Sequence, residues 1–243
     1  MNHHCLNCSY ETNGNYCSNC GQKTSTHRYS LQHFFAHDFV HGIFHLDSGF
    51  LYTIKELFTR PGHSVREFIQ GKRAKHLNYF TAVILLLTIT YFVSKWAKVE
   101  LTEVFTSSIG LSRVVKDYVK LTTLIAVPIY ALFSYLIFKK TKQNYTENIV
   151  INMFLLVGML VFRLTLHIVI ALTSNIEAIN LINLALGIIT YIYISIFCYQ
   201  YFSAFEYSKG VLIRKVLLFS LLILSIKQGI NLLINEIGIQ YFH

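Results

Sequence analysis

Long apolar stretches occupy most of the chain after residue 78. They cover residues 79–97, 121–138, 149–172, 179–202 and 211–234. Each holds about the 20 residues that an α-helix needs to cross the hydrocarbon core of a bilayer. Pro128 interrupts the second stretch, and Arg214, Lys215 and Lys227 shorten the fifth. The pattern predicts an all-α integral membrane protein in which residues 79–243 form a bundle of about five transmembrane helices.

The segment before this bundle, residues 25–78, carries shorter apolar stripes at helical spacing. Ser30 can cap a first helix, in which Leu31, Phe35, Phe39 and Ile43 recur every four residues. This spacing places the four apolar side chains on one face and predicts an amphipathic helix.

Two further amphipathic helices are predicted ahead of the first apolar stretch. Residues 50–58 form one apolar face, and the pattern stops at the Arg-Pro-Gly sequence of residues 60–62. Ser64 and Glu67 have the spacing of a capping box, which predicts a helix that begins there and ends at Gly71. Basic residues nearby suit these helices either to lie on the cytoplasmic leaflet or to pack on the cytoplasmic ends of the spans. The sequence leaves both arrangements open.

Composition supports a membrane protein. The chain is 53% hydrophobic and only 14% charged, and its mean hydropathy of +0.46 lies outside the usual range of soluble proteins. The polar, cysteine-rich N-terminus does not resemble a signal peptide, because the first apolar stretch begins only near residue 79.

The formal charge of +9 is distributed unevenly along the chain. With five spans and a cytoplasmic N-terminus, 14 of the 21 lysines and arginines fall in cytoplasmic segments. The positive-inside rule therefore predicts a cytoplasmic N-terminus and an external C-terminus. This bias accounts for most of the basicity, so we expect the lipid bilayer as a partner and do not expect nucleic acid.

Four cysteines near the N-terminus form two Cys-x2-Cys pairs. They are Cys5, Cys8, Cys17 and Cys20. Two such pairs match the ligand spacing of a tetrahedral Zn²⁺ site, and four thiolates leave no open position, so residues 1–24 are predicted to be a zinc ribbon with structural zinc. Gly14 and Gly21 are expected to supply its tight turns. The alternative, a pair of disulfides, is disfavoured by the reducing cytoplasm.

A second group of candidate ligands is a ladder of histidines at four-residue spacing, which includes His37, His41 and His45. His37 and His41 could share a second metal ion on one helix face, whereas a third ligand at His45 would require a break near Gly42. His37, Asp38 and His41 approximate the zincin pattern, with Asp in place of Glu. A metal site, a metallohydrolase, a pH sensor and a polar face without metal all remain open.

Polar residues also occur within the predicted spans. Arg163 and His167 lie near the middle of the third span, and Lys227 lies in the fifth. Charges at that depth are destabilising unless paired or hydrated, so we expect these side chains to face the bundle interior. They suit an anion or a lipid headgroup better than a cation, although backbone carbonyls, lipid phosphate or interior water could equally satisfy them.

Several short motifs recur in an order typical of one protein family. They are Cys-x2-Cys-Gly-Gln-Lys at residues 17–23, Asp47-x-Gly49, Thr53, Glu56-Leu57-Phe58, Arg60-Pro61-Gly62 and Gly71-Lys72-Arg73. This order resembles a bacterial family of multipass membrane proteins with an N-terminal zinc ribbon, catalogued as domain of unknown function 3667. The resemblance covers residues 5–80, and similar members carry His-Glu-x-x-His where this chain has Asp38. It implies an architecture and no particular activity.

No complete catalytic constellation is present in the sequence. We therefore expect a non-enzymatic scaffold or regulatory subunit in the bacterial cytoplasmic membrane, whose ribbon docks an unidentified cytoplasmic protein. One alternative is a small transporter or channel component for an anionic or lipid-like solute. Another is a membrane-associated metal centre, acting as a hydrolase or a metal or pH sensor, at the histidine ladder.

Overall fold

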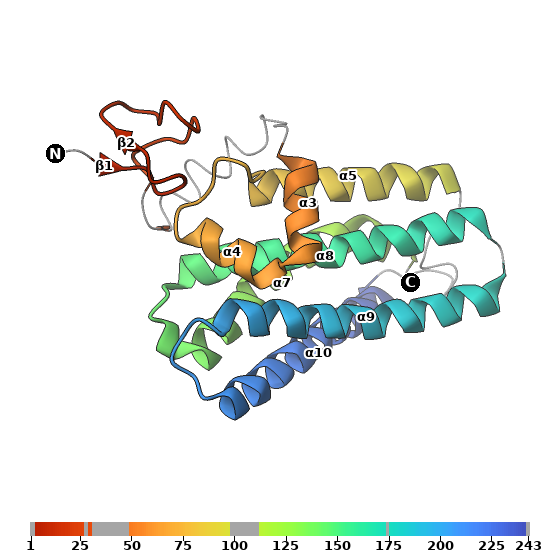
Figure 1. Ribbon diagram of the computed structural model, residues 1–243. Helices are drawn as coiled ribbons and strands as arrows, with labels where there is room; N and C mark the ends of the chain where they lie inside the picture. Colours follow the sequence, from red (N-terminus) through yellow and green to blue (C-terminus); the bar gives the residue numbers. More distant parts are fainter. Residues whose placement is uncertain (1–2, 27–28, 31–48, 98–111, 174, 242–243) are drawn as a thin grey trace.

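The computed structural model describes residues 3–26, 29–30, 49–97, 112–173 and 175–241 (Figure 1). The elements are β1 (His3–His4), β2 (Glu11–Thr12), α3 (Phe50–Thr59), α4 (Pro61–Ile69), α5 (Tyr79–Ala97), α7 (Ser112–Ile137), the 3₁₀ turn η2 (Lys139–Thr141), α8 (Tyr145–Leu172), α9 (Ile176–Phe202) and α10 (Lys209–Tyr241). Apart from the two short antiparallel strands, the regular structure described is helical. The predicted all-α class is confirmed for this part of the chain.

Three of the described helices are long and apolar enough to cross a membrane. They are α5 over Tyr79–Trp96, α8 over Tyr145–Leu172 and α9 over Ile176–Phe202, and they coincide with three of the five predicted spans. Among the residues whose side chains the structure describes, α7 has a shorter apolar stretch over Thr123–Ile137, and α10 carries basic residues near its start. The described helices therefore support a membrane protein with three candidate spans.

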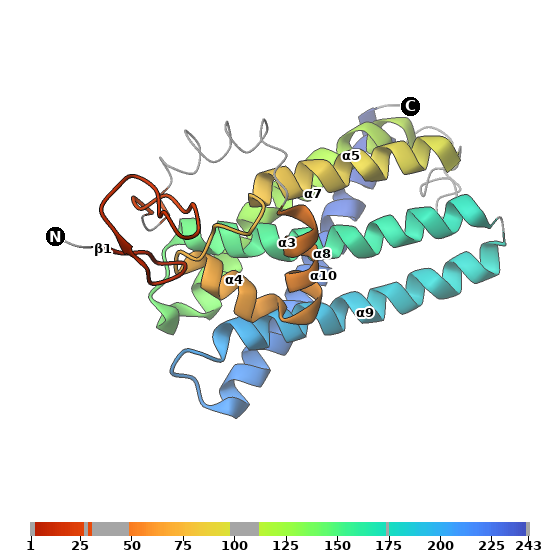
Figure 2. The same ribbon diagram turned by 45° about the horizontal axis from the view of Figure 1, so that its top comes forward.

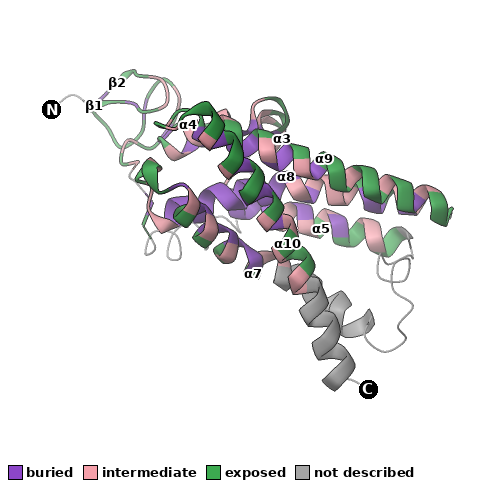
Figure 3. Ribbon diagram, turned by 90° about the horizontal axis from the view of Figure 1, so that it is seen from below, coloured by how far each residue is buried: buried purple, intermediate pink, exposed green. Residues whose placement is uncertain are grey.

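Helix α8 lies at the centre of the bundle, in contact with α5, α7 and α9 (Figure 1). Its first half is buried on nearly every side, as the burial colours show (Figure 3). A helix surrounded in this way must be apolar all round rather than amphipathic. A capping box between Asn144 and Glu147 defines its start.

Polar side chains join α7 to α8 within this core. Ser134 donates from its hydroxyl to Asn148 Oδ1 at 2.8 Å, and Asn152 Nδ2 donates to the Ser134 hydroxyl at 3.0 Å. All three residues are buried. Hydrogen bonds of this kind fix the register of helices that apolar packing alone would leave free to slide.

The outer faces of α9 and α10 expose many large apolar side chains. They include Leu181, Leu184, Ile188, Ile192, Leu217 and Leu221. Such a continuous apolar surface is unfavourable in water, but it is the expected surface of a helix in contact with lipid.

Helices α3 and α4 form a hairpin that packs directly on the bundle. Helix α3 runs across the long helices, and α4 lies against α9 (Figures 1 and 2). Phe58 packs its ring against those of Phe162 and Tyr193, with centroids 5.4 and 5.6 Å away. The amphipathic pattern of residues 50–58 is thus explained by packing on the spans.

An aromatic cluster anchors the other end of the hairpin. The ring of Phe154 on α8 contacts those of Phe68, His76 and Tyr79, with centroids 4.8, 6.3 and 5.9 Å away. Burial lowers the pKa of the His76 imidazole, which favours its neutral form in this cluster. Rings from α4, the following linker, α5 and α8 therefore share one core.

The predicted capping box at Ser64 and Glu67 is wrong. Helix α4 begins three residues earlier, at Pro61, because proline is well suited to the first helical turn, where its missing N–H needs no partner. Ser64 is consequently buried inside the helix, and Glu67 forms a bidentate ion pair with Arg60, with N–O distances of 3.2 and 3.0 Å. Arg60 also pairs with Glu56, so this network ties α3 to α4.

Candidate metal centre

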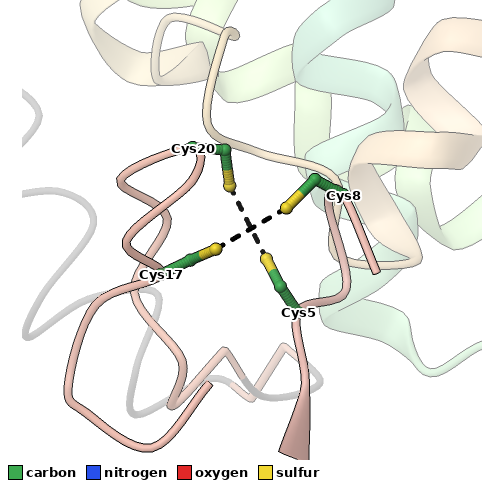
Figure 4. A group of neighbouring side chains, drawn as sticks. All are labelled: Cys5, Cys8, Cys17 and Cys20. Atoms are coloured by element: carbon green, nitrogen blue, oxygen red, sulfur yellow. Dashed lines mark hydrogen bonds between the residues drawn. The ribbon is translucent and has the colours of Figure 1, made fainter. Parts of the chain in front are cut away.

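The four N-terminal cysteines come together in the structure. Their sulfur atoms lie within 4.8 Å of one another and point toward a common centre (Figure 4). The Cys5 and Cys20 sulfurs are 3.6 Å apart, as are those of Cys8 and Cys17. These distances exclude disulfides, which require about 2.05 Å. They approach the roughly 3.8 Å edge of a tetrahedron with metal–sulfur bonds of about 2.3 Å.

Each Cys-x2-Cys pair is folded by the same backbone turn. The N–H of Ser9 donates to the Cys5 carbonyl, and the N–H of Gly21 donates to the Cys17 carbonyl, both at 2.8 Å. Ser9 and Gly21 both have positive φ, at 60° and 72°. The expected role of Gly21 is therefore confirmed. Gly14 lies in a bend of the linker between the two pairs without a positive φ, and Ser9 takes the left-handed position of the first turn.

The thiols of this cluster differ in their electrostatic surroundings. A hydrogen bond from the Tyr10 backbone, with a further one from Asn19, lowers the pKa of Cys8 to about 6. Burial raises the pKa of Cys20 to about 11. Four thiolates this close repel one another strongly, so full ionisation requires a cation among them. The cluster can therefore hold a metal ion, with all four positions of a tetrahedron filled by the chain.

The cysteine module is fixed to the linker between α4 and α5 through Gln22. Its amide donates to the Gly71 carbonyl at 2.8 Å and accepts from the N–H groups of Arg73 and Ala74 at 2.9 and 3.1 Å. Gln22 is buried, and its bond to the Gly71 carbonyl is shielded from water. Leu6 also packs on Gly71, whose φ of +110° and lack of a Cβ allow the close approach.

We expect Gln22→Ala to loosen this junction without removing the metal. The change removes three hydrogen bonds between the module and the linker, each of which contributes about 0.5–1.5 kcal/mol to the docked arrangement. Hydrogen exchange of residues 71–77 should accelerate while the metal content stays unchanged. Lys23→Ala, at the exposed neighbouring position, is the matched control. Unchanged exchange in Gln22→Ala would contradict the docking role.

The polar residues of the predicted spans lie on two helices. Arg163 and His167 are on α8, and Lys227 is on α10. Nδ1 of His167 is 2.9 Å from the Arg163 carbonyl, one turn earlier in the same helix. Arg163 and Lys227 are within electrostatic range of each other. The expectation that all three side chains face the bundle interior holds for His167, which is buried, but is wrong for Lys227, which is exposed, while Arg163 is half-buried. Among the described side chains, no carboxylate forms an ion pair with either cation.

The histidine ladder, including His37, His41 and His45, lies outside the described residues, as does the first amphipathic helix predicted after Ser30. Cys198, by contrast, is fully buried in the bundle core.

Sequence reasoning missed two residues that build the junction. Gln22 was visible only as part of the Cys-Gly-Gln-Lys motif, and nothing in that motif specifies its partners. Arg66 donates to the carbonyls of Gln200 and Tyr201 at 2.8 and 3.1 Å, at the C-terminal end of α9. A cation at this end of a helix is favourable because the last carbonyls are unpaired and the dipole is negative there.

Comparison with known proteins gives one match. Neither the curated proteins nor the solved structures contain a significant match to the chain. Residues 47–91 match a family described as "Protein of unknown function (DUF3667)". This segment comprises α3, α4, the linker that receives Gln22, and the first part of α5. The similarity to this family therefore falls on the hairpin, its junction with the cysteine module and the first candidate span.

Proposed function

We propose that the protein is a non-enzymatic, membrane-anchored zinc-ribbon scaffold or regulatory subunit that docks a cytoplasmic protein. In this proposal the four cysteines bind structural Zn²⁺, and residues 79–243 cross the bacterial cytoplasmic membrane five times, with the N-terminus inside and the C-terminus outside. The ribbon (residues 1–24) and the helices of residues 25–78 then form the cytoplasmic face.

The observation that carries the proposal is the firm docking of the ribbon. Gln22 and Leu6 hold the module against the linker before α5, so the ribbon is presented in a fixed orientation. Tyr10 and Tyr16 are exposed on it by 52% and 64%. Exposed aromatic side chains on a rigid support are favourable anchors for a partner protein, because little conformational entropy is lost on binding.

Site-specific photocrosslinking in intact cells tests this role. A photoreactive phenylalanine derivative at Tyr16 should yield one discrete protein adduct, and Cys17→Ser with Cys20→Ser should abolish it. The same probe at Leu217, on the lipid-facing side of α10, is the control and should not give that adduct. A ribbon that binds metal normally and forms no discrete adduct from either tyrosine would overturn the proposal.

The second candidate function is a transporter or channel component for an anionic or lipid-like solute. The electrostatic interaction between Arg163 and Lys227 favours it, because two neighbouring cations on apolar helices attract an anion. Under this alternative, Arg163→Gln should stop solute flux in proteoliposomes while protein abundance remains normal.

A further inference from the structure

A cavity lies where the cysteine module meets the bundle. Its volume is about 340 Å³, which is in the range of small-molecule sites. The module contributes Leu6 to its wall, the segment that follows the module contributes Thr26, and α4 contributes Arg66. The start of α8 and the end of α9 contribute Glu147 and Tyr201. The cavity is thus assembled from segments that only the tertiary structure brings together.

Two arginines give one side of this cavity a positive charge. Arg66 is held by backbone carbonyls of α9, which orient its guanidinium without neutralising it. Arg73 stacks on the ring of Tyr29, with its guanidinium carbon 4.1 Å from the ring centroid, and donates through Nε to the Phe68 carbonyl. Stacked and oriented guanidinium groups are well suited to bind phosphate oxygens.

The cavity also carries hydrogen-bond acceptors. Glu147 is its only acidic lining residue and is 3% exposed. The side-chain amide of Gln143 is hydrogen-bonded to the Tyr201 hydroxyl at one end, and its other end is buried with no partner among the described residues. An amide group unsatisfied at one end is unfavourable unless a ligand or water completes it. Positive and negative groups therefore line the same cavity, which suits a zwitterion.

The position of the cavity matches that of phospholipid headgroups. Helices α8 and α9 have 28 and 27 residues, about 42 and 40 Å at 1.5 Å per residue, and so exceed the roughly 30 Å hydrocarbon core. Glu147 lies in the first turn of α8, and Tyr201 lies in the last turn of α9. If the hydrocarbon core is centred on these helices, their end turns extend beyond it, at the level where phosphate and ammonium groups reside.

We propose that this cavity binds a phosphate–ammonium zwitterion of the phosphoethanolamine type, as in the headgroup of phosphatidylethanolamine. Arg66 and Arg73 contact the phosphate, and Glu147 accepts from the ammonium. This site does not depend on the scaffold role, since it requires no protein partner. It depends on the folded cysteine module, because Leu6 lies between two metal ligands and forms part of the wall.

Native mass spectrometry of the delipidated full chain in detergent tests the site with dioleoyl phosphatidylethanolamine. Arg73→Gln removes one phosphate contact and should weaken binding about tenfold, as expected for the loss of a charge-assisted hydrogen bond. Gln70→Trp, at an exposed position on the cavity rim, should block binding while both arginines are kept. Lys72→Gln removes an adjacent exposed cation that does not line the cavity, and should leave binding within about twofold.

A second pair of measurements tests the ammonium contact. Glu147→Gln preserves the capping box, which accepts either residue. This variant should lose the preference for phosphatidylethanolamine over phosphatidylglycerol, which has no ammonium. Equal binding of the two lipids by the native chain would overturn the assignment of Glu147.

A competition experiment distinguishes a lipid ligand from a soluble ligand with the same headgroup chemistry. Soluble O-phosphoethanolamine that displaces the lipid at equal concentration would identify a soluble ligand of the same chemistry, whereas resistance to displacement identifies the lipid. Binding of neither compound, or equal binding by native chain, Arg73→Gln and Gln70→Trp, overturns the proposal. Lipid binding can be lost while the Tyr16 crosslink persists, so this failure is distinguishable from failure of the scaffold role.

Discussion

Replacing Cys17 and Cys20 by serine is expected to abolish metal binding by the cluster and to unfold the cysteine module. The module has two strands of two residues each and few buried side chains, so packing contributes little to its stability. Metal binding to four thiolates supplies about 10–16 kcal/mol in small modules of this kind and is there the main source of folding free energy. Elemental analysis should show the loss of one metal ion per chain, and hydrogen exchange of residues 5–24 should become fast.

Two further variants test whether the loss of metal is specific to the cysteine cluster. Cys198→Ser changes a cysteine in the bundle core and should leave the metal content unchanged, because this thiol is far in sequence from the cluster and buried in the bundle core. His37→Ala with His41→Ala separates the structural ion from a second metal site: one zinc that persists leaves only the ribbon, whereas a fall from two to one establishes a histidine site. A metal content that does not fall when Cys17 and Cys20 are replaced would contradict the proposed zinc site.

Substituting Gly62 by alanine will separate α4 from α9. An alanine Cβ at this position would lie 2.2 Å from the Phe197 carbonyl oxygen and 2.3 Å from the Tyr201 nitrogen. Both are backbone atoms of a helix, which cannot yield without moving the whole element. We expect destabilisation by about 3 kcal/mol, the upper end for overpacking, and a markedly lower melting temperature in detergent.

The control for this prediction is Gly210→Ala in α10. An added Cβ there meets no atom within 4 Å, so the exchange should be neutral or slightly stabilising through helix propensity. Hydrogen exchange of α4 should rise in Gly62→Ala and stay native in Gly210→Ala. Equal melting temperatures for both variants would show that α4 does not pack on α9 at this point.

Local rules predicted much of the secondary structure. The apolar stretches at residues 79–97, 149–172 and 179–202 coincide with α5, α8 and α9, because about 20 consecutive apolar residues are sufficient for a spanning helix. The amphipathic pattern of residues 50–58 likewise predicted α3. The start of α4 was misplaced, since Ser64 and Glu67 fit a capping box by spacing alone while Pro61 determined the first turn.

The candidate metal site was likewise predicted in part by the sequence. Cysteine spacing predicted that the four thiols would converge. The prediction succeeded because each Cys-x2-Cys pair closes its own short turn. Spacing could not tell which residue takes the left-handed position, and Ser9 holds it in the first pair while Gly21 holds it in the second. Serine is unusual in this conformation, so its residue type gave no signal of that position.

By itself the sequence determined the elements and chemistry that depend on nearby residues: apolar helices of spanning length, amphipathic α3 and a four-cysteine cluster. Only the tertiary structure decided how these parts join. The partners of Gln22 are 49 to 52 residues away, and Arg66 reaches carbonyls more than 130 residues away. Periodicity and spacing report only local geometry, whereas such contacts depend on how helices pack, so the cavity between ribbon and bundle is visible only in the folded chain.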